Sequence, residues 1–402
     1  MREELLHFIW RFRHFNQQEL WTEDGQRLHI LFPGEPNSHQ GPDFGHARIR
    51  IGENLCEGPV ELHIHSSDWV RHAHDGDVHY QPVILHVVWE HDRHDLPGNI
   101  PLLVLQPRVS KWLLSRYDRW MKELAFVPCE PQLGSVDAPL WRDWLAELSL
   151  QRLRRRAVAV QRCLQHHRQD WEETAWWWLA RSMGLPVNAD LFEAVARSLP
   201  LRLLRRQRAY PVALEALLLG QAGLLGDGAG EAGSLRDGAG QEQEAHVREY
   251  RFLRVKYGLK PVEMPVSFLR MRPGNFPTLR LRQLAGLLAM GRGWYAVVRE
   301  ANTAEEVVAA LAGPPGLGLA MRRGILVNAF IPLVFAGGQE EKALRWLAEL
   351  PPENNTILRG WKALGVTAAD AAGSQGLLEL KKEYCNARRC LECAIGRALL
   401  AA

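Results

Sequence analysis

Two acidic residues and several histidines are closely spaced in residues 41–65, which read GPDFGHARIRIGENLCEGPVELHIH. Asp43 follows a proline at the start of one apolar stretch, and Glu61 and His63 lie two residues apart in the next. A carboxylate in apolar surroundings is costly unless a cation or a hydrogen-bond donor pairs with it. Mg²⁺ prefers oxygen ligands, and a bound ion can activate water for hydrolysis. Asp43, Glu61 and His63 are therefore candidate ligands of a catalytic Mg²⁺ or Mn²⁺, and the alternative is a polar sheet face.

Two short strands are expected to position these side chains. ARIRI at 47–51 and PVELHIH at 59–65 alternate apolar and polar residues, and GENLCEG between them is typical of a turn. Successive strand side chains point to opposite faces, so Glu61, His63 and His65 share one face of the predicted hairpin. An acid and an imidazole are therefore expected side by side on one strand, near an acid at the head of its neighbour.

This arrangement resembles the motif of the PD-(D/E)XK phosphodiesterase superfamily, in which an Asp heads one strand and a Glu and a basic residue follow on the next. His63 stands where that motif has lysine. The resemblance implies a metal-dependent nuclease in which Asp43 and Glu61 hold the ion and His63 orients water. It also implies an acid on the first helix, for which Glu19 is the available candidate. A neutral imidazole can ligate a metal or act as a general base, which makes Mn²⁺ more plausible than in the standard motif.

A second group of candidate ligands follows in SSDWVRHAHDGDVHY, at 66–80. Its acids and histidines are Asp68, His72, His74, Asp75, Asp77 and His79. Such a density allows a Zn, Fe or Mn site in a hydrolase that acts on a small molecule. For each of these residues the alternative is a solvated loop side chain. His86, within the apolar run PVILHVVW, is expected to be a buried core histidine.

The expected fold class is α+β. Apolar periodicity predicts a helix at 3–20 and another at 110–125. Besides the hairpin, the β-like runs are 28–32, 82–89 and 101–109.

Farther along, the apolar period changes to 3.6, and successive helical segments begin at Asp, Asn or Pro. The sequence therefore predicts a mixed α/β domain at 1–128, with a PD-(D/E)XK-like sheet core. A larger all-α domain follows at 129–402, with a Gly/Ala/Glu-rich loop at 226–245.

Three of the six cysteines lie close together in YCNARRCLECAIG. In a cytosolic chain, such a cluster favours metal ligation over disulfides. Cys385, Cys390 and Cys393 are candidate ligands of Zn²⁺ or a [4Fe–4S] cluster, and Cys129 of FVPCEP is the candidate fourth ligand. The alternative is a set of buried free thiols.

A basic stretch, RMRPGNFPTLRLRQLAG, is a candidate nucleic-acid contact. Its arginines flank two prolines and an aromatic ring at a predicted helix start, a combination that suits phosphate contact and base stacking. The candidate residues are Arg270, Arg272, Phe276, Arg280 and Arg282. The alternative is a set of solvated arginines at a helix start that Phe276 packs against.

The composition is that of a globular protein, with 402 residues, 47% hydrophobic residues and a net charge of +3. No uninterrupted apolar run reaches the roughly 18 residues needed to cross a bilayer. The segment MREELLHFIWRFRHF carries acids where a signal peptide has its apolar core. A cytoplasmic location without a membrane partner is expected.

Arginine-rich segments suit DNA or RNA as a partner, and the sequence does not determine the oligomeric state.

Seven ordered segments resemble a bacterial family of unknown function over essentially the whole chain: NSHQGPDFGHARI, GPVELHIHSSDWVRHAHDGD, VILHVVW, EALLLGQAGLL, EYRFLRVKYGL, RMRPGNFPTLRL and YCNARRCLECAIG. The resemblance implies a cytoplasmic bacterial protein of two parts, without an established activity. Some PD-(D/E)XK nucleases hold their fold with an iron–sulfur cluster bound by one distant cysteine and three near the C-terminus. Cys129 and the three clustered cysteines are similar in kind, although their spacing differs.

The resulting hypothesis is a metal-dependent nuclease or phosphodiesterase that acts on nucleic acid. Two alternatives remain open: a catalytically silent nucleic-acid-binding or scaffold protein, and a His/Asp-metal hydrolase of a small molecule. Separated Asp43 and Glu61 carboxylates would exclude the nuclease. Convergence of His72, His74 and His79 would favour the small-molecule hydrolase.

Overall fold

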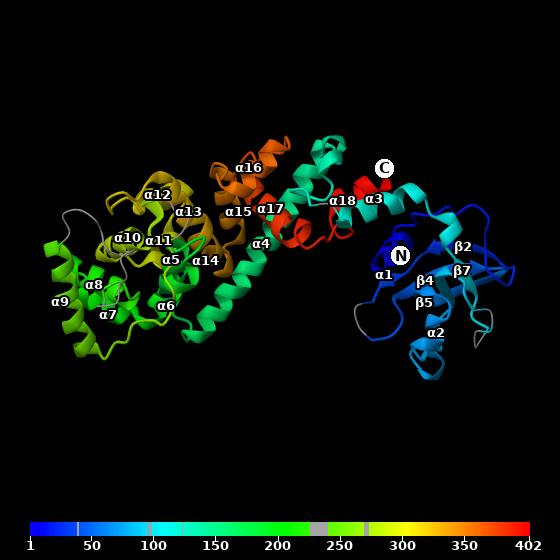
Figure 1. Ribbon diagram of the computed structural model, residues 1–402, viewed down its shortest axis with the longest axis horizontal. Helices are drawn as coiled ribbons and strands as arrows, with labels where there is room; N and C mark the ends of the chain where they lie inside the picture. Colours follow the sequence, from blue (N-terminus) through cyan, green and yellow to red (C-terminus); the bar gives the residue numbers. More distant parts are fainter. Residues whose placement is uncertain (38–39, 94, 96–98, 123, 226–239, 269–272) are drawn as a thin grey trace. The chain divides into compact units, whose positions relative to one another are not determined.

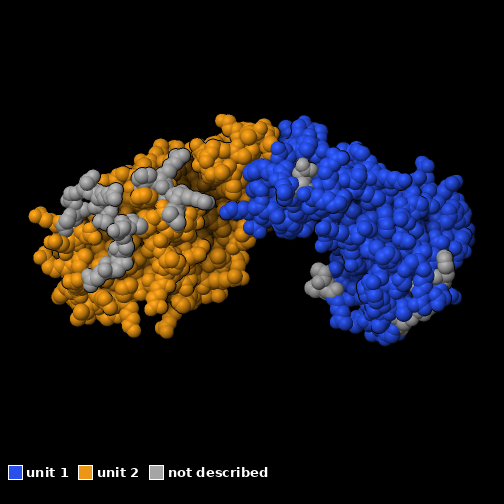
Figure 2. Space-filling model, in the orientation of Figure 1, with its two compact units in different colours: residues 1–141, 381–402 blue, residues 142–380 orange. Residues whose placement is uncertain are grey.

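Two compact units make up the chain in a computed structural model, which describes residues 1–37, 40–93, 95, 99–122, 124–225, 240–268 and 273–402. Unit 1 comprises residues 1–141 and 381–402, and unit 2 comprises residues 142–380 (Figure 2). The sequence instead predicted a single division after residue 128. Unit 1 is therefore discontinuous, because the segment that follows unit 2 belongs to it.

A mixed sheet forms the centre of unit 1 (Figure 1). Within the described residues, seven strands take part in the order β1-β2-β4-β5-β6-β7, and β3 pairs with β4. The pairs from β1 to β5 are antiparallel, whereas β5, β6 and β7 are parallel. The strands are β1 Leu20–Trp21, β2 Arg27–Phe32, β3 Glu35–Pro36, β4 Phe44–Ile51, β5 Asn54–His65, β6 Leu85–Glu90 and β7 Leu102–Val104.

The predicted hairpin is formed by β4 and β5. Gly52, with φ of 58°, lies in its turn, where a left-handed backbone favours glycine. Burial alternates along β4, with Ile49 buried and Arg48 and Arg50 exposed. Successive side chains of β5 are all buried at residues 60–63, because helices α1 and α2 both pack on this strand. Glu61 and His63 are therefore more enclosed than a polar sheet edge would be.

A short crossover joins β5 to the parallel strand β6, as a parallel pair requires. It contains α2 Asp68–Arg71 and the 3₁₀ turn η1 His74–Gly76. Trp69 of α2 is buried and contacts the ring of His63 edge-on, at 6.4 Å between centroids. The crossover thus carries its histidines over the polar residues of β5.

Helix α1, Glu3–Arg11, packs its apolar side chains against β5. The predicted helix at 3–20 is too long. Arg13 and Glu19 have positive φ values of 56° and 50°, which no α-helix accommodates. Glu19 therefore lies on an exposed turn before β1, and its predicted place on the first helix is wrong.

The remaining described elements of unit 1 come from both segments of the chain. Helix α18 contacts α3. The elements are the 3₁₀ turns η2 Gln106–Arg108 and η3 Glu130–Ser135, helix α3 Lys111–Lys122, the π-helical turn η7 Leu380–Cys385, which begins at the boundary, and helix α18 Ala394–Ala401.

Unit 2 is all-α within its described residues, as the sequence predicted, and the chain as a whole is α+β. Its core contains the buried rings of Trp176, Phe192, Phe330 and Trp346. Its helices are α4 Ala138–His166, which begins in unit 1, α5 Trp171–Met183, α6 Ala189–Ser198, α7 Leu201–Gln207, α8 Pro211–Gln221, α9 Gly240–Tyr257, α10 Pro277–Ala289, α11 Trp294–Glu300, α12 Ala304–Ala310, α13 Leu319–Ile325, α14 Ile331–Ala336, α15 Glu340–Glu349, α16 Thr356–Ala363 and α17 Ala371–Glu379, with η5 Pro273–Asn275 and the π-helical turn η6 Leu326–Phe330.

One continuous helical segment, Leu319–Ala336, is long and apolar enough to cross a membrane by length and composition alone. It comprises α13, η6 and α14 and includes Arg322 and Arg323. Ile325 and Phe330 are fully buried in the core of unit 2. The segment therefore has the surroundings of a core helix.

Candidate metal centre

Asp43 and Glu61, the two acids predicted from the sequence, come together at the head of β4. The register pairs Phe44 with Val60, so Asp43 lies opposite Glu61. The backbone N–H of Asp43 donates to Glu61 Oε2 at 3.0 Å, and the backbone N–H of Leu62 donates to Asp43 Oδ2 at 3.0 Å. A β-bulge between Phe44 and Ala47 bends the strand beside this pair. Each carboxylate is thus oriented by the backbone of the other strand.

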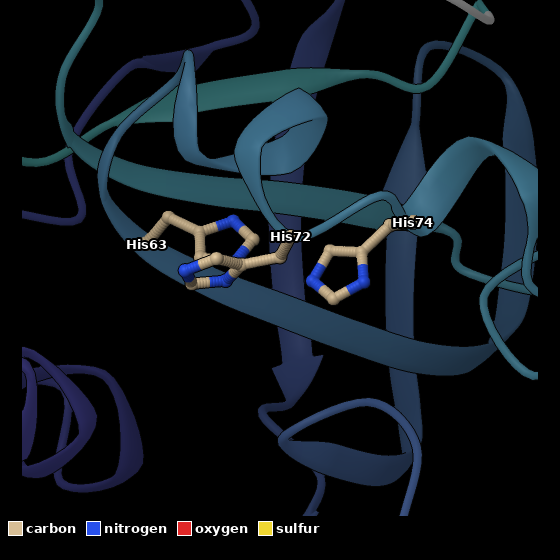
Figure 3. A group of neighbouring side chains, drawn as sticks. All are labelled: His63, His72 and His74. Atoms are coloured by element: carbon tan, nitrogen blue, oxygen red, sulfur yellow. The ribbon is translucent and has the colours of Figure 1, made fainter.

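Three imidazoles converge beside the carboxylates (Figure 3). His63 comes from β5, His72 follows α2 and His74 begins η1. One ring nitrogen from each lies within 4.8 Å of the others, and His63 Nε2 is 3.2 Å from His72 Nδ1. Ala73, between the two loop histidines, has φ of 57°, so the chain turns tightly there. This turn brings both loop histidines to the imidazole of the strand.

Glu61 connects the carboxylate pair with the histidines. Its Oε1 lies 3.4 Å from His63 Nε2 and 3.4 Å from His74 Nε2. His74 Nε2 is buried and makes no hydrogen bond, which is costly for a polar atom without a ligand. Neutral imidazole nitrogens with one carboxylate form a donor set that suits Zn²⁺, Fe²⁺ or Mn²⁺. The residues present therefore fit a first-row transition metal.

His86 supports the site from the neighbouring strand. The parallel register pairs Glu61 with His86, which places both on the same face of the sheet. His86 Nε2 lies 2.9 Å from His63 Nδ1, and His86 is buried, as the sequence predicted. A partner at the second ring nitrogen fixes the orientation of a metal-ligating histidine. His86 thus orients the other nitrogen of His63 toward Glu61 and His72.

Burial keeps His63, His74 and His86 neutral. It lowers the pKa of His63 to about 2, and the charges of His86, His74 and His72 add to the effect. Burial likewise lowers the pKa of His86 to about 3 and also lowers that of His74. A neutral imidazole has a free lone pair for a metal, so these rings need not lose a proton before they bind one.

The pKa of Glu61 is shifted in the opposite direction. Burial, together with the charge of Asp43, raises the pKa of Glu61 to about 8, despite the hydrogen bond from the backbone of Asp43. Burial and the charge of Glu61 also raise the pKa of Tyr80 to about 12, and the Tyr80 ring stacks on His74 with 3.7 Å between centroids. A cation bound beside this carboxyl group would favour its ionised form, because it would compensate the negative charge that burial disfavours.

A second, smaller group adjoins Asp43 on its other side. His7 Nε2 of α1 lies 3.3 Å from Asp43 Oδ2, and Glu3, one turn earlier, completes a trio of ligand atoms within 4.8 Å of one another. Burial opposes protonation of His7, but the hydrogen bond to Asp43 and the charges of Asp43, Glu3 and Glu4 raise its pKa. Glu3 is therefore the acid of the first helix beside Asp43, in place of the predicted Glu19.

Sequence reasoning missed His7 and Glu3, although the signal was present. The two residues are four positions apart on an amphipathic helix, a spacing that places both on one face. Glu19 was the predicted acid because the helix was expected to reach it.

Among the described side chains of 66–80, Asp68, Asp77 and His79 have partners outside the centre. Asp68 is buried, accepts from the backbone N–H of His65 and pairs with Arg71 at 2.8 Å. His79 pairs with Asp77 at 2.7 Å. The side chain of Asp75 lies outside the described residues. The trio whose convergence would favour the small-molecule hydrolase was His72, His74 and His79. The structure instead groups His72 and His74 with His63.

A groove of about 490 Å³ runs beside His7 in unit 1. Its wall combines arginines with aromatic rings: Arg2, Arg11, Arg388, Arg389, Phe12 and Tyr117. Arg2 and Arg11 are exposed, whereas Arg388 donates to the carbonyl of Trp120 and Arg389 pairs with Glu392. The groove therefore offers exposed positive charge next to the Asp43–His7 pair.

The basic stretch of unit 2 is largely engaged within its own unit. Arg270 and Arg272 lie outside the described residues. Phe276 packs edge-on against Phe268 at 5.8 Å, and Arg280 donates to Gln283 and to Asn275. Arg282 pairs with Glu242 at 3.2 Å and lies 3.7 Å from Glu215. The described residues of this stretch thus have partners in the fold, and nucleic-acid binding by them stays a prediction.

The four cysteines predicted to act together all belong to unit 1, although the whole of unit 2 lies between Cys129 and the other three in the sequence. Cys390 and Cys393 are buried, as is Cys129, and Cys385 is half-buried. No disulfide joins any of these four thiols, which the structure describes in full. Metal ligation by them stays a prediction.

The fold and the site together define an α+β protein with a candidate metal centre built from histidines and carboxylates. The sequence model of a family described as "Protein of unknown function (DUF2851)" matches residues 3–315, so the chain belongs to this family. No curated protein and no solved structure matched the chain. The description of the family names no activity, so the site itself is the basis for a function.

Proposed function

We propose that this protein is a metal-dependent hydrolase that cleaves phosphodiester bonds in nucleic acid. The observation that carries the proposal is the convergence of His63, His72 and His74. Glu61 Oε1 lies 3.4 Å from two of these rings, those of His63 and His74, and the oriented carboxylate of Asp43 lies beside it. Phosphodiester hydrolysis needs a cation and a positioned water, and this arrangement offers a ligand set for the first and a base for the second.

The roles follow from the positions of the groups. Glu61 and the three histidines would hold the ion, which supplies a Lewis acid and lowers the pKa of bound water. His7 of α1 lies 3.3 Å from Asp43, whose backbone N–H donates to Glu61. A carboxylate–imidazole pair can accept the proton of an attacking water or donate one to a leaving oxygen. His86 and Tyr80 hold the histidine rings in place.

Two features support a phosphodiester substrate. An Asp at the head of one strand, with an acid and a base two residues apart on the next and on the same face, is the arrangement of the PD-(D/E)XK motif. The groove beside His7 carries exposed Arg2 and Arg11 and aromatic rings, which suit phosphate contact and base stacking. A cytoplasmic location, expected from the sequence, is consistent with DNA or RNA as the substrate.

A cleavage assay on plasmid DNA and on single-stranded RNA with Mn²⁺ tests this proposal. We expect Glu61→Gln to lower the rate at least about 100-fold, since it removes the charge of the ion's carboxylate ligand. Glu57→Gln is the matched control, because Glu57 is an exposed acid on the same strand. Equal cleavage by the parent and Glu61→Gln, or no cleavage by the Mn²⁺-loaded parent, would contradict the proposal and favour a silent binding or scaffold protein.

A small-molecule hydrolase is the second candidate, and the histidine trio favours it, because such a donor set is common to metal hydrolases of several classes. A chromogenic phosphate monoester and a carboxylic ester, assayed with the same variants, separate the two candidates. Hydrolysis of these compounds that depends on Glu61, without cleavage of nucleic acid, would select the small-molecule hydrolase.

A further inference from the structure

The two chain segments of unit 1 share four cysteines. Cys129 belongs to the first segment, and Cys385, Cys390 and Cys393 belong to the segment that returns after unit 2. These thiols are buried or half-buried, and no disulfide joins any of them within the described part of unit 1. Both segments of unit 1 therefore contribute enclosed thiols that no disulfide links.

Trp120 of α3 connects the two cysteine-bearing regions. Its indole Nε1 donates to Gln132 Oε1 at 3.2 Å, three residues after Cys129. Its backbone carbonyl accepts from Arg388 Nη1 at 2.6 Å, and Arg388 lies between Cys385 and Cys390. Arg388 has φ of 57°, a left-handed conformation that is unusual for arginine. These bonds hold the Cys129 turn and the Cys385–Cys390 loop against the same residue.

The remaining thiols are fixed by helix α18. Cys393 precedes the first residue of this helix, and its carbonyl accepts from the backbone N–H of Arg397 at 2.8 Å. A Cβ at Gly396 would lie 2.3 Å from the carbonyl oxygen of Cys390, so only glycine allows the Cys390 turn to pack this closely on α18. Cys390 and Cys393 are thus held in one tight turn.

The thiols are close enough to influence one another electrostatically. Burial, then the neighbouring thiols, raise the pKa of Cys129, of Cys385 and of Cys390, the last to about 12. Lys381 and Arg388 act in the opposite direction on Cys385 and Cys390. As ligands of a cationic centre these thiols would be deprotonated, and the nearby Lys381 and Arg388 would offset part of their negative charge.

We propose that Cys129, Cys385, Cys390 and Cys393 ligate an iron–sulfur cluster that joins the two segments of unit 1. The spacing Cys-x4-Cys-x2-Cys with a fourth, distant cysteine is one of the patterns that hold such clusters. A single Zn²⁺, with Zn–S bonds of about 2.3 Å, needs sulfur atoms within about 4 Å of one another. Among the described residues, the groups whose ligand atoms all lie within 4.8 Å of one another contain histidines and carboxylates and do not include these thiols. A polynuclear cluster holds its thiolate ligands farther apart than a single Zn²⁺ does, so it fits thiols that fall outside this limit.

Anaerobic purification of the full chain, followed by reconstitution with iron and sulfide, tests this proposal. The readouts are bound iron, acid-labile sulfide and visible absorption. We expect the parent to bind a cluster, and Cys129→Ser and Cys393→Ser to lose most of it. Cys56→Ser and Cys163→Ser are matched controls and retain it, because these two thiols lie outside the group. An absence of iron and sulfide in the parent, equal iron in Cys129→Ser and Cys56→Ser, or one tightly held zinc in place of iron would overturn the assignment.

A measurement on the parent protein avoids variants that fail to fold. Under native conditions, the four grouped cysteines should be protected from alkylation until a chelator and an oxidant destroy the cluster. Cys56 should react to the same extent before and after this treatment. Equal alkylation of all of them before and after that treatment would contradict the proposal. Because neither readout uses hydrolytic activity, failure of this proposal is distinguishable from failure of the proposed function.

Discussion

The carboxylates of Asp43 and Glu61 each accept a hydrogen bond from the backbone of the segment that carries the other acid. The N–H of Asp43 donates to the Glu61 carboxylate, and the N–H that follows Glu61 donates to the Asp43 carboxylate, both at 3.0 Å. Glu61 accepts through Oε2, so its Oε1 is left to face His63 and His74. Asp43 Oδ2, which accepts from the backbone, also lies beside His7. In the proposed hydrolase, the pair would therefore separate the side that holds the ion from the side that transfers protons.

Metal binding should release a proton at neutral pH. Because the pKa of Glu61 is raised to about 8, the metal-free carboxyl is largely protonated at pH 7 and an ion must displace that proton. We expect the affinity for Mn²⁺ to rise about tenfold per pH unit between about pH 6 and 8 and to level off above that. Calorimetric titrations in buffers of different ionisation enthalpy measure the released proton directly. Affinity that does not change over this range would argue against Glu61 as a ligand.

The same shift predicts how stability depends on pH. Between about pH 4.5 and 8 the folded state keeps the Glu61 proton that the unfolded state has lost, so this group lowers the free energy of unfolding as pH rises. Glu61→Gln has no carboxyl group to titrate, so this decrease in the free energy of unfolding is absent from the variant. We therefore expect the metal-free variant to melt at a higher temperature than the parent at pH 8 and at nearly the same temperature at pH 4. Glu57→Gln should follow the parent at both values. If Glu61→Gln changed the melting temperature by the same amount at pH 4 and at pH 8, titration of this carboxyl group would not explain the change.

Substitution of His72 tests whether the histidines of the centre bind the ion, with little risk to the fold because His72 is exposed. We expect His72→Ala to weaken Mn²⁺ binding about 10- to 100-fold, since one of the converging imidazoles is removed. Isothermal titration calorimetry measures the change. His79→Ala is the control, because His79 pairs with Asp77 outside the centre and its loss should leave the affinity unchanged. Equal weakening by both variants would indicate a general effect of the loop.

Unit 2 offers an independent test of packing. A Cβ at Gly220 of α8 would lie 2.3 Å from the ring of Tyr250 on α9, so Gly220→Ala should lower the free energy of unfolding by about 1–3 kcal/mol. Gly324→Ala is the matched control, because a Cβ at this helical position meets no atom within 4 Å. There the better helix former should raise stability by up to about 1 kcal/mol. Chemical denaturation compares the two, and a stabilised Gly220→Ala would show that α8 and α9 are less closely packed.

The hairpin and its acids could be predicted because their signals are local. Alternation in residues 47–51 and 59–65 fixes which face each side chain takes, and pairing of adjacent strands then brings Asp43 to Glu61. The length of the first helix could not be read from the apolar pattern. The pattern continues to Phe15, but the backbone leaves the helix after Arg11.

The rest of the candidate centre depends on geometry that sequence spacing does not encode. His72 and His74 reach His63 through a crossover whose turn requires a left-handed alanine, Ala73. His86 reaches His63 through the register of two parallel strands that are not joined by a tight turn. Such contacts are set by the packing of the whole unit, so the residue types of the site could be read from the sequence but their grouping could not.

Unit 1 can finish folding only late in biosynthesis, because its two segments are far apart in the chain. During translation, residues 381–402 leave the ribosome only after all of unit 2 has been made, so the first segment must wait for its complement while the helices of unit 2 already assemble. Until then, the surface of α3 that α18 covers is open to other chains or to chaperones. Deleting or masking this late segment would therefore impair a part of the protein that was synthesised long before it.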